Sequence, residues 1–248
     1  MVAASLACGG DAARSGDEAV DRGSASDAVQ DTQGAPRGDE DRRSVAGDAT
    51  GSSPGTDARE AARGTIVFLG TSLTAGLGVP ENEAYPALIA ARIDSAGLPY
   101  AVVNAGSSGE TSAGALQRID WVLEHREVAV LVLETGANDG LRGLDVAGTT
   151  ANIDSIIRKV RSARPEARIF LVQMEAPPNL GDGYTRAFRA MYPTLAARHG
   201  AELVPFLLEG VAGVDTLNQG DGIHPNEAGH RVLAETVWRV LRRGLGGR

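Results

Sequence analysis

Five short, mainly apolar segments constrain the fold of this chain more than any other feature of its sequence. They span residues 65–69, 100–104, 128–133, 168–174 and 201–206. The clearest, Thr65-Ile-Val-Phe-Leu69, is apolar without alternation. A continuous apolar run of this length is typical of a strand that is buried on both faces. Because such strands occur in parallel sheets covered by helices, the segments predict an α/β fold.

Stretches with helical periodicity lie between the apolar segments. They cover about residues 83–97, 111–125, 146–163 and 184–199, and a last one covers 226–243. Strands that alternate with helices build βαβ units. We therefore predict a three-layer α/β/α sandwich with a five-stranded parallel sheet, an arrangement like that of flavodoxin.

The composition changes sharply near residue 63. All ten aromatic residues lie beyond that point, and residues 1–63 contain no Ile and a single Leu, Leu6. Such a segment cannot bury enough apolar surface to offset the chain entropy that folding removes. We predict that residues 9–63 form a disordered acidic tether and that residues 64–248 form one domain.

The first eight residues, MVAASLAC, resemble the end of a bacterial lipoprotein signal, in which the cysteine becomes the lipidated first residue. Ser5 stands where such signals usually have Leu, and the charged start of a signal is missing. Cys8 is thus a candidate lipidation site, with the protein tethered to a membrane in the bacterial cell envelope or periplasm. The alternative is an ordinary terminus with a chance cysteine, which leaves the protein in the cytoplasm if Met1 is the true start.

Charge and composition argue against several classes of function. The net charge of −8 divides into −5 for residues 1–63 and −3 for the remainder, which has no run of basic residues. Nucleic acid is therefore not expected as a partner. No stretch of about 18 apolar residues occurs, so no transmembrane helix is predicted. A single cysteine excludes an internal disulfide and a cysteine-based zinc site.

The segments that follow the predicted strands are the candidate functional site, because ligands of parallel sheets bind at the carboxyl ends of the strands. Each segment alone is compatible with an ordinary turn or helix cap. Together they supply a nucleophile, a base, a group that orients the base and donors for an oxyanion, as acyl transfer requires. In chain order the candidates are Ser72, a glycine of the segment 104–111, Asn138, Asp221 and His224.

Two familiar serine or glycine motifs do not fit the first of these segments, Gly70-Thr-Ser-Leu-Thr-Ala-Gly76. No Gly-Lys-Ser/Thr follows, so it is not a phosphate-binding P-loop. Position 74 is Thr rather than Gly, which argues against the nucleophile elbow of α/β-hydrolases. In the last segment, Asp221 precedes His224 by three residues, so its carboxylate can fold back onto the imidazole and fix its tautomer.

The four segments are G-T-S-L-T-A-G at residues 70–76, S-S-G-E-T at 107–111, G-A-N-D-G at 136–140 and D-G-I-H-P at 221–225. They resemble, in order, the four signature blocks of the SGNH hydrolases, also called the GDSL esterase/lipase family. The resemblance covers about residues 65–243. It implies that Ser72 is the nucleophile and that His224 and Asp221 complete a catalytic triad. It also implies an oxyanion hole formed by the backbone N–H groups of Ser72 and Gly109 and the side-chain amide of Asn138, without a metal or cofactor.

Within this family, the short domain and the stretch G-A-N-D-G-L-R-G that ends at Gly143 look most like the bacterial arylesterase/thioesterase I/lysophospholipase L1 group. The resemblance implies a serine ester hydrolase that cleaves aryl esters, lysophospholipids or acyl thioesters through an acyl-enzyme. The alternatives are a carbohydrate O-acetylesterase and a non-catalytic tethered binding module. Thr71 stands where the family usually has Asp. We expect it to change the loop geometry or the pH profile rather than to abolish activity.

Other polar residues near these segments are expected to be structural. His230 is predicted to lie on the surface of the last helix. His125 and His199 fall near helix ends, where a cation is favourable, and are expected to act as caps. Glu134 and Asp139 are expected to form hydrogen bonds to nearby backbone.

Overall fold

The computed structural model describes residues 64–246. The predicted lipoprotein signal at residues 1–8, including Cys8, and the predicted tether at 9–63 lie outside the described residues and stay predictions. No helix in the described part of the chain is both long and apolar enough to cross a membrane.

The five predicted strands form one all-parallel sheet with the order β2-β1-β3-β4-β5, which confirms the α/β class. The chain adds β2 on one side of β1 and all later strands on the other side. The loops after β1 and β3 therefore diverge at a topological switch point, where α/β sheets open a crevice. The strands are β1 (Gly64–Gly70), β2 (Tyr100–Gly106), β3 (Val128–Glu134), β4 (Arg168–Val172) and β5 (Glu202–Val204).

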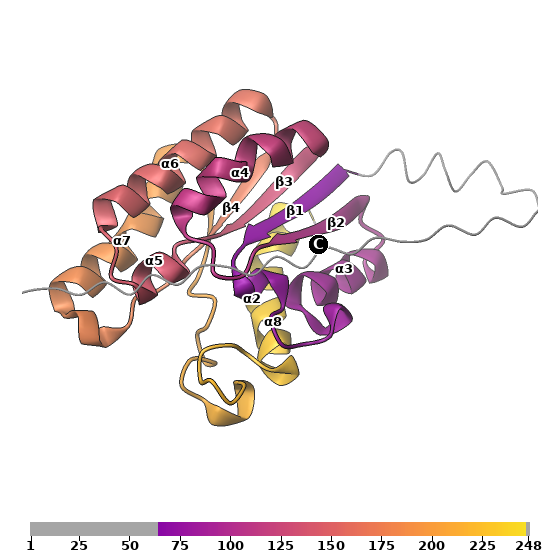
Figure 1. Cartoon of the computed structure of the whole chain (residues 1–248). Coiled ribbons are helices and arrows are strands. Elements are labelled where there is room, and N and C mark those ends of the chain that lie inside the picture. The colour runs from indigo at the N-terminus through magenta and orange to yellow at the C-terminus, as the bar shows by residue number, and fades with distance from the viewer. Residues whose placement is uncertain (1–63, 247–248) are drawn as a thin grey trace, which may run out of the picture. The chain divides into compact units, whose positions relative to one another are not determined.

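Helices cover both faces of the sheet, as the three-layer prediction requires (Figure 1). Helices α3 and α8 pack together on one face, and α6 packs between α4 and α7 on the other. The long helices are α3 (Tyr85–Ser95), α4 (Ser112–His125), α6 (Val146–Ala163), α7 (Asp182–His199) and α8 (Glu227–Gly244). Two short ones, α2 (Ser72–Ala75) and α5 (Ala137–Leu141), follow β1 and β3.

Local sequence explains where three of the long helices begin. Thr111, Asp145 and Asn226 each accept, through the side chain, a hydrogen bond from the backbone N–H three residues later. Such caps satisfy one of the N–H groups that a helix start leaves without a partner. The sequence did not predict α2 and α5, because one turn of helix is too short to show a 3.6-residue period. The same holds for the 3₁₀ turns Glu81–Glu83, Pro178–Leu180 and Asp215–Leu217.

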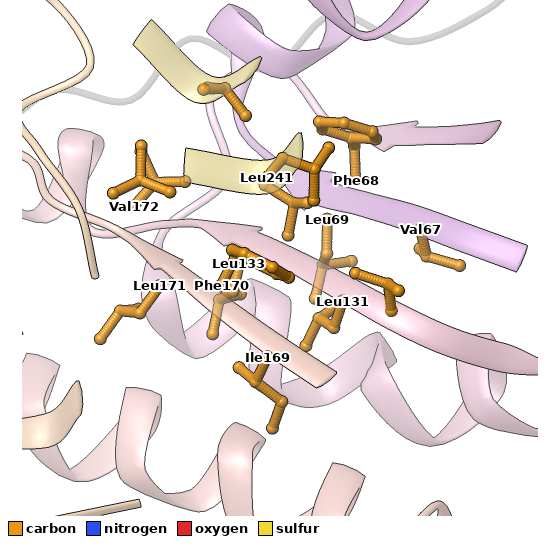
Figure 2. Close-up of a cluster of buried hydrophobic side chains, with 14 of the residues drawn as sticks. Val67, Phe68, Leu69, Leu131, Leu133, Ile169, Phe170, Leu171, Val172 and Leu241 are labelled. Carbon is orange, nitrogen blue, oxygen red and sulfur yellow. The ribbon is translucent and has the colours of Figure 1, made fainter. Parts of the chain in front are cut away.

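Helix α8 lies close against the sheet. Figure 2 shows Leu241 of α8 among buried side chains from β1, β3 and β4, including Phe68, Leu133 and Phe170. A Cβ atom on Gly244 would collide with the ring of Phe170, so the glycine permits this close approach. This packing holds the last turns of α8 against the sheet, and the helix begins at Glu227, three residues after His224.

The prediction that His230 lies on the surface is wrong, because its side chain is only 1% exposed. Its Nδ1 atom accepts a hydrogen bond of 3.2 Å from the backbone N–H of Tyr85, the first residue of α3. The two rings are also stacked. Ala84, at the start of α3, has no side chain that could provide this cap. The capping partner is 145 positions away in the sequence, so no local pattern could reveal it.

Burial lowers the pKa of His230 from 6.5 to about 4, so the folded protein holds this imidazole neutral. The unfolded chain binds a proton at the ordinary pKa of 6.5, before the folded chain does. Acid therefore favours unfolding in the window between these values. The contribution of His230 to stability is complete above that window and is lost as the pH falls through it.

We expect the free energy of unfolding to fall by ~2 kcal/mol between about pH 7 and pH 5 through this group. The His230→Asn variant retains a hydrogen-bond acceptor but has no titratable group, so its stability should fall less over the same range. Urea unfolding of both proteins at the two pH values measures the difference. An equal fall in both would show that His230 is not the titrating group.

Candidate active site

Ser72 is the first residue of α2, directly after β1 and Thr71, and its side chain is 8% exposed. The end of β2 holds this turn in place. A Cβ atom on Gly106 would collide with the backbone of Ala75, so the two segments touch without side chains between them. The backbone N–H of Ser107 donates a hydrogen bond of 2.8 Å to the carbonyl of Gly70.

The structure brings Ser72, His224 and Asp221 into one chain of hydrogen bonds. Ser72 Oγ lies 2.9 Å from His224 Nε2, and His224 Nδ1 lies 2.6 Å from Asp221 Oδ2. The other carboxylate oxygen accepts hydrogen bonds from the backbone N–H groups of Ile223 and His224. The hydrogen bond from the His224 ring, with smaller contributions from these N–H groups, holds the pKa of Asp221 well below its usual range.

These contacts assign the tautomer of His224. An ionised carboxylate only accepts hydrogen bonds, so the proton of the neutral ring is on Nδ1, which faces Asp221. The lone pair of Nε2 then faces the hydroxyl of Ser72. These hydrogen bonds have the arrangement of a Ser-His-Asp triad.

Hydrogen bonds from Gln219 stabilise the loop that contains His224 and connect it to the segment after α2. The backbone N–H of Gln219 donates to the carbonyl of His224 at 2.8 Å, and its side-chain amide donates to the carbonyl of Pro225. The same amide donates to the carbonyl of Leu77 at 2.7 Å. Gly222 takes the left-handed conformation, with a φ of 68°, that turns the chain between Asp221 and His224.

The other two candidate residues come from the loops after β2 and β3. Gly109 has a φ of 76°, a conformation that favours glycine, and its carbonyl accepts a hydrogen bond of 3.0 Å from Arg142. Asn138 lies in the first turn of α5, and its Nδ2 donates to the carbonyl of Glu110 at 2.9 Å. An amide NH₂ has two hydrogens, so this bond leaves one N–H of Asn138 for a ligand. The bond also joins the two loops.

An ion pair that the sequence did not reveal supports the loop of Gly109. Arg118 of α4 binds both carboxylate oxygens of Glu110, at 2.6 and 2.8 Å, and also donates to the carbonyl of Ala105 at 2.7 Å. The Glu110 side chain is only 9% exposed. A bidentate Arg–carboxylate pair restricts orientation as well as distance. No motif relates these two residues, which are eight positions apart.

The two carboxylates beside the third segment form hydrogen bonds to distant side chains as well as to backbone. Asp139 accepts from the N–H and hydroxyl of Ser112 and from the hydroxyl of Thr149, which joins α5 to α4 and α6. Glu134 accepts from the N–H and hydroxyl of Thr71, the residue that replaces the usual Asp. The sequence predicted only hydrogen bonds from nearby backbone to Glu134 and Asp139, whereas both carboxylates also bind side chains that are distant in the sequence.

The histidines near helix ends differ in role. His125 Nδ1 lies 2.8 Å from the carbonyl of Trp121 in the last turn of α4, as expected of a cap. His199 at the end of α7 instead places Nε2 2.8 Å from a carboxylate oxygen of Asp154 in α6. Among residues 64–246, no group of three or more His, Cys, Asp or Glu side chains is arranged to hold a metal ion.

A serine hydroxyl bonded to a His–Asp pair, at the carboxyl edge of a parallel α/β sheet, is typical of hydrolases that use a serine nucleophile. The family comparison gives the same class. Residues 68–232 match the model of the GDSL-like lipase/acylhydrolase family. The chain belongs to this family.

Similar proteins of named activity are carboxylic ester hydrolases. Esterase TesA of Pseudomonas aeruginosa is 41% identical over 74% of this chain and 90% of its own length. Thioesterase 1/protease 1/lysophospholipase L1 of Escherichia coli is 36% identical over 74% of this chain and 86% of its own. The arylesterase of Vibrio mimicus is 32% identical over 73% of this chain and 89% of its own.

Solved structures agree with these relatives. The crystal structure of TesA superposes with a TM-score of 0.69 at 41% identity, over 72% of this chain and 98% of that one. The psychrotrophic esterase EstA from Pseudoalteromonas sp. superposes with a TM-score of 0.70 at 32% identity, over 74% of this chain and 99% of that one. This chain is accordingly a carboxylic ester hydrolase with the SGNH hydrolase fold.

We expect the Arg118→Met variant to lose about 3 kcal/mol of unfolding free energy, because the nearly buried carboxylate of Glu110 is then left without its cation. Replacing Glu110 with Gln in the same protein removes the unpaired charge. The double variant should therefore be more stable than the sum of the two single changes predicts. Urea unfolding of the four proteins measures this coupling, and strictly additive changes would contradict the role of the ion pair.

Proposed function

We propose that the protein hydrolyses acyl esters through a triad of Ser72, His224 and Asp221, with a covalent acyl-enzyme as intermediate. The observation that carries the proposal is the unbroken chain of hydrogen bonds from Asp221 Oδ2 through the His224 ring to Ser72 Oγ. The names of the relatives support aryl esters, lysophospholipids and acyl thioesters as the substrate class.

In the acylation step, Ser72 Oγ attacks the carbonyl carbon of the ester while its proton passes to His224 Nε2. The ring then carries a positive charge, which the Asp221 carboxylate stabilises through Nδ1–H. When the tetrahedral intermediate collapses, the bond to the leaving oxygen or sulfur breaks and His224 returns the proton to that atom. The products of this step are the free alcohol or thiol and an acyl ester on Ser72.

The negative charge of the intermediate needs donors that are already in place. We assign this role to the backbone N–H groups of Ser72 and Gly109 and to the side-chain N–H of Asn138. In the second step, water attacks the acyl-enzyme while His224 accepts its proton. The proton returns to Ser72 Oγ as the carboxylic acid leaves, so the enzyme is regenerated without a cofactor.

Exposed apolar side chains close in sequence to the proposed catalytic residues support an acyl group as the substrate. Six large apolar residues are exposed in the described part of the chain, and three of them lie within five residues of a proposed catalytic side chain. Leu77 follows α2, Leu141 ends α5 and Ile223 precedes His224. Each is at least 45% exposed. An acyl chain that packs on these side chains removes apolar surface from water, and this favours its binding.

The Ser72→Ala variant should lose at least about 10⁴-fold in kcat on p-nitrophenyl esters, because no other group can form the acyl-enzyme. A phosphonate inhibitor should label the wild type at Ser72 and leave the variant unlabelled, as mass spectrometry would show. Ser95→Ala is a matched control, since among residues 64–246 this exposed hydroxyl at the end of α3 bonds only its own helix. Full activity of Ser72→Ala would refute the proposed nucleophile.

A series of p-nitrophenyl esters from acetate to palmitate separates the alternatives. Highest activity on medium or long chains supports the thioesterase and lysophospholipase substrates. Activity on acetate alone supports a carbohydrate O-acetylesterase instead. Absence of both turnover and labelling of the wild type would support a binding module.

The Asn138→Ala variant should lose about 10²–10³-fold in kcat, the usual effect of removing one oxyanion donor. KM should change little, because the donor acts on charge that develops only in the transition state. Steady-state kinetics on the preferred ester measures both constants. A loss in kcat below about tenfold would remove Asn138 from the oxyanion hole.

A further inference from the structure

Glu134, the last residue of β3, is a buried carboxylate outside the proposed triad, and its side chain is fully inaccessible to solvent. Oε2 accepts hydrogen bonds from the backbone N–H of Thr71 at 2.8 Å and from the Thr74 hydroxyl at 2.9 Å. The Thr71 hydroxyl lies 3.0 and 3.1 Å from the two carboxylate oxygens. All these donors belong to the segment that contains Ser72.

The hydrogen bonds among Tyr85, Thr74 and Glu134 all run in one direction, from donor to acceptor toward Glu134. Thr74 donates its only hydroxyl hydrogen to Glu134, so Tyr85, whose hydroxyl lies 2.8 Å from that of Thr74, is the donor of their bond. The hydroxyl hydrogens of the cluster therefore point toward Glu134, whose oxygens act as acceptors. Burial raises the pKa of Glu134, and the bonds from Thr71 and Thr74 oppose that rise.

The backbone of the nucleophile turn passes directly over this carboxylate. A Cβ atom on Gly70 would collide with the Thr74 hydroxyl and lie 2.7 Å from Glu134 Oε2. The site therefore has no room for a side chain between β1 and Glu134. Thr71 and Thr74 flank Ser72 on both sides, so a group that holds both of them holds the whole turn.

We propose that Glu134 is the positioning residue of the nucleophile: it anchors Thr71 and Thr74 from beneath and so aims Ser72 Oγ at His224 Nε2. In this chain Thr71 serves as a hydroxyl donor to Glu134, whereas the Asp usual at this position would set a second carboxyl group against it. The inference rests on the proposed role of Ser72 as the nucleophile, and it adds Glu134 as the residue that positions the Ser72 side chain.

The Glu134→Gln variant tests the anchor with little change of shape. A glutamine has one acceptor oxygen, and its NH₂ group would face hydroxyl donors, so part of the cluster must come apart. We expect kcat to fall about 10–100-fold with KM nearly unchanged, because a misplacement of about 1 Å can cost that much in rate. A merely structural role would lower the thermal stability and leave kcat as it was.

Two Thr71 variants test the hydroxyl separately, in case Glu134→Gln does not fold. Thr71→Val keeps the shape and the backbone N–H but removes the hydroxyl, and its kcat should fall. Thr71→Ser keeps the hydroxyl and should retain the wild-type kcat. Thr135→Val is the matched control: this neighbouring hydroxyl is equally buried, and among the described residues it has no hydrogen-bond partner. Its loss should leave kcat unchanged.

Wild-type kcat in both Glu134→Gln and Thr71→Val, with only a lower melting temperature, would overturn the inference while leaving the proposed function intact. No turnover by the wild type would instead overturn the proposed function. Crystal structures of wild type and Glu134→Gln would then still decide the positioning role. The distance between Ser72 Oγ and His224 Nε2, which is 2.9 Å here, should lengthen in the variant. An unchanged distance would refute the positioning role of Glu134.

Discussion

The burial of the parallel sheet on both faces is the constraint on which the rest of this structure depends. Helices α3 and α8 on one side and α4, α6 and α7 on the other bury most of the central strands β1, β3 and β4. Along these central strands, polar side chains lie mainly at the strand ends. The order β2-β1-β3 makes the chain diverge at the ends of β1 and β3, so the segments of Ser72 and Asn138 leave neighbouring strands at the same edge of the sheet.

The loops at this edge are held by charged groups that are paired or hydrogen-bonded. Glu134 binds the turn of Ser72, Arg118 binds Glu110 in the loop of Gly109, and Asp139 joins α5 to its neighbouring helices. A buried charge is tolerated only where such partners compensate for its lost hydration. Each of these charges therefore favours one loop geometry over others. A catalytic site benefits, because its groups must be in place before the reaction begins.

Replacement of the usual Asp by Thr71 fits this description. The expectation from the sequence was a change in loop geometry or pH profile, without loss of activity. The Thr71 hydroxyl donates to Glu134, and Ser72 Oγ remains 2.9 Å from His224 Nε2. The departure from the family pattern is therefore accommodated within one cluster of hydrogen bonds and leaves the proposed triad geometry intact.

The sequence by itself determined the α/β class, the five strands, the long helices and the four segments that contain the candidate residues. These features depend on local periodicity, caps and turns, which a single segment can show. Only the tertiary structure decided that Thr71 faces Glu134, 63 positions away, and that His230 caps α3 across 145 positions. Such contacts form where strands and helices pack against one another. The sequence around each of these two residues does not indicate its partner. For the same reason His230 was predicted at the surface and is buried.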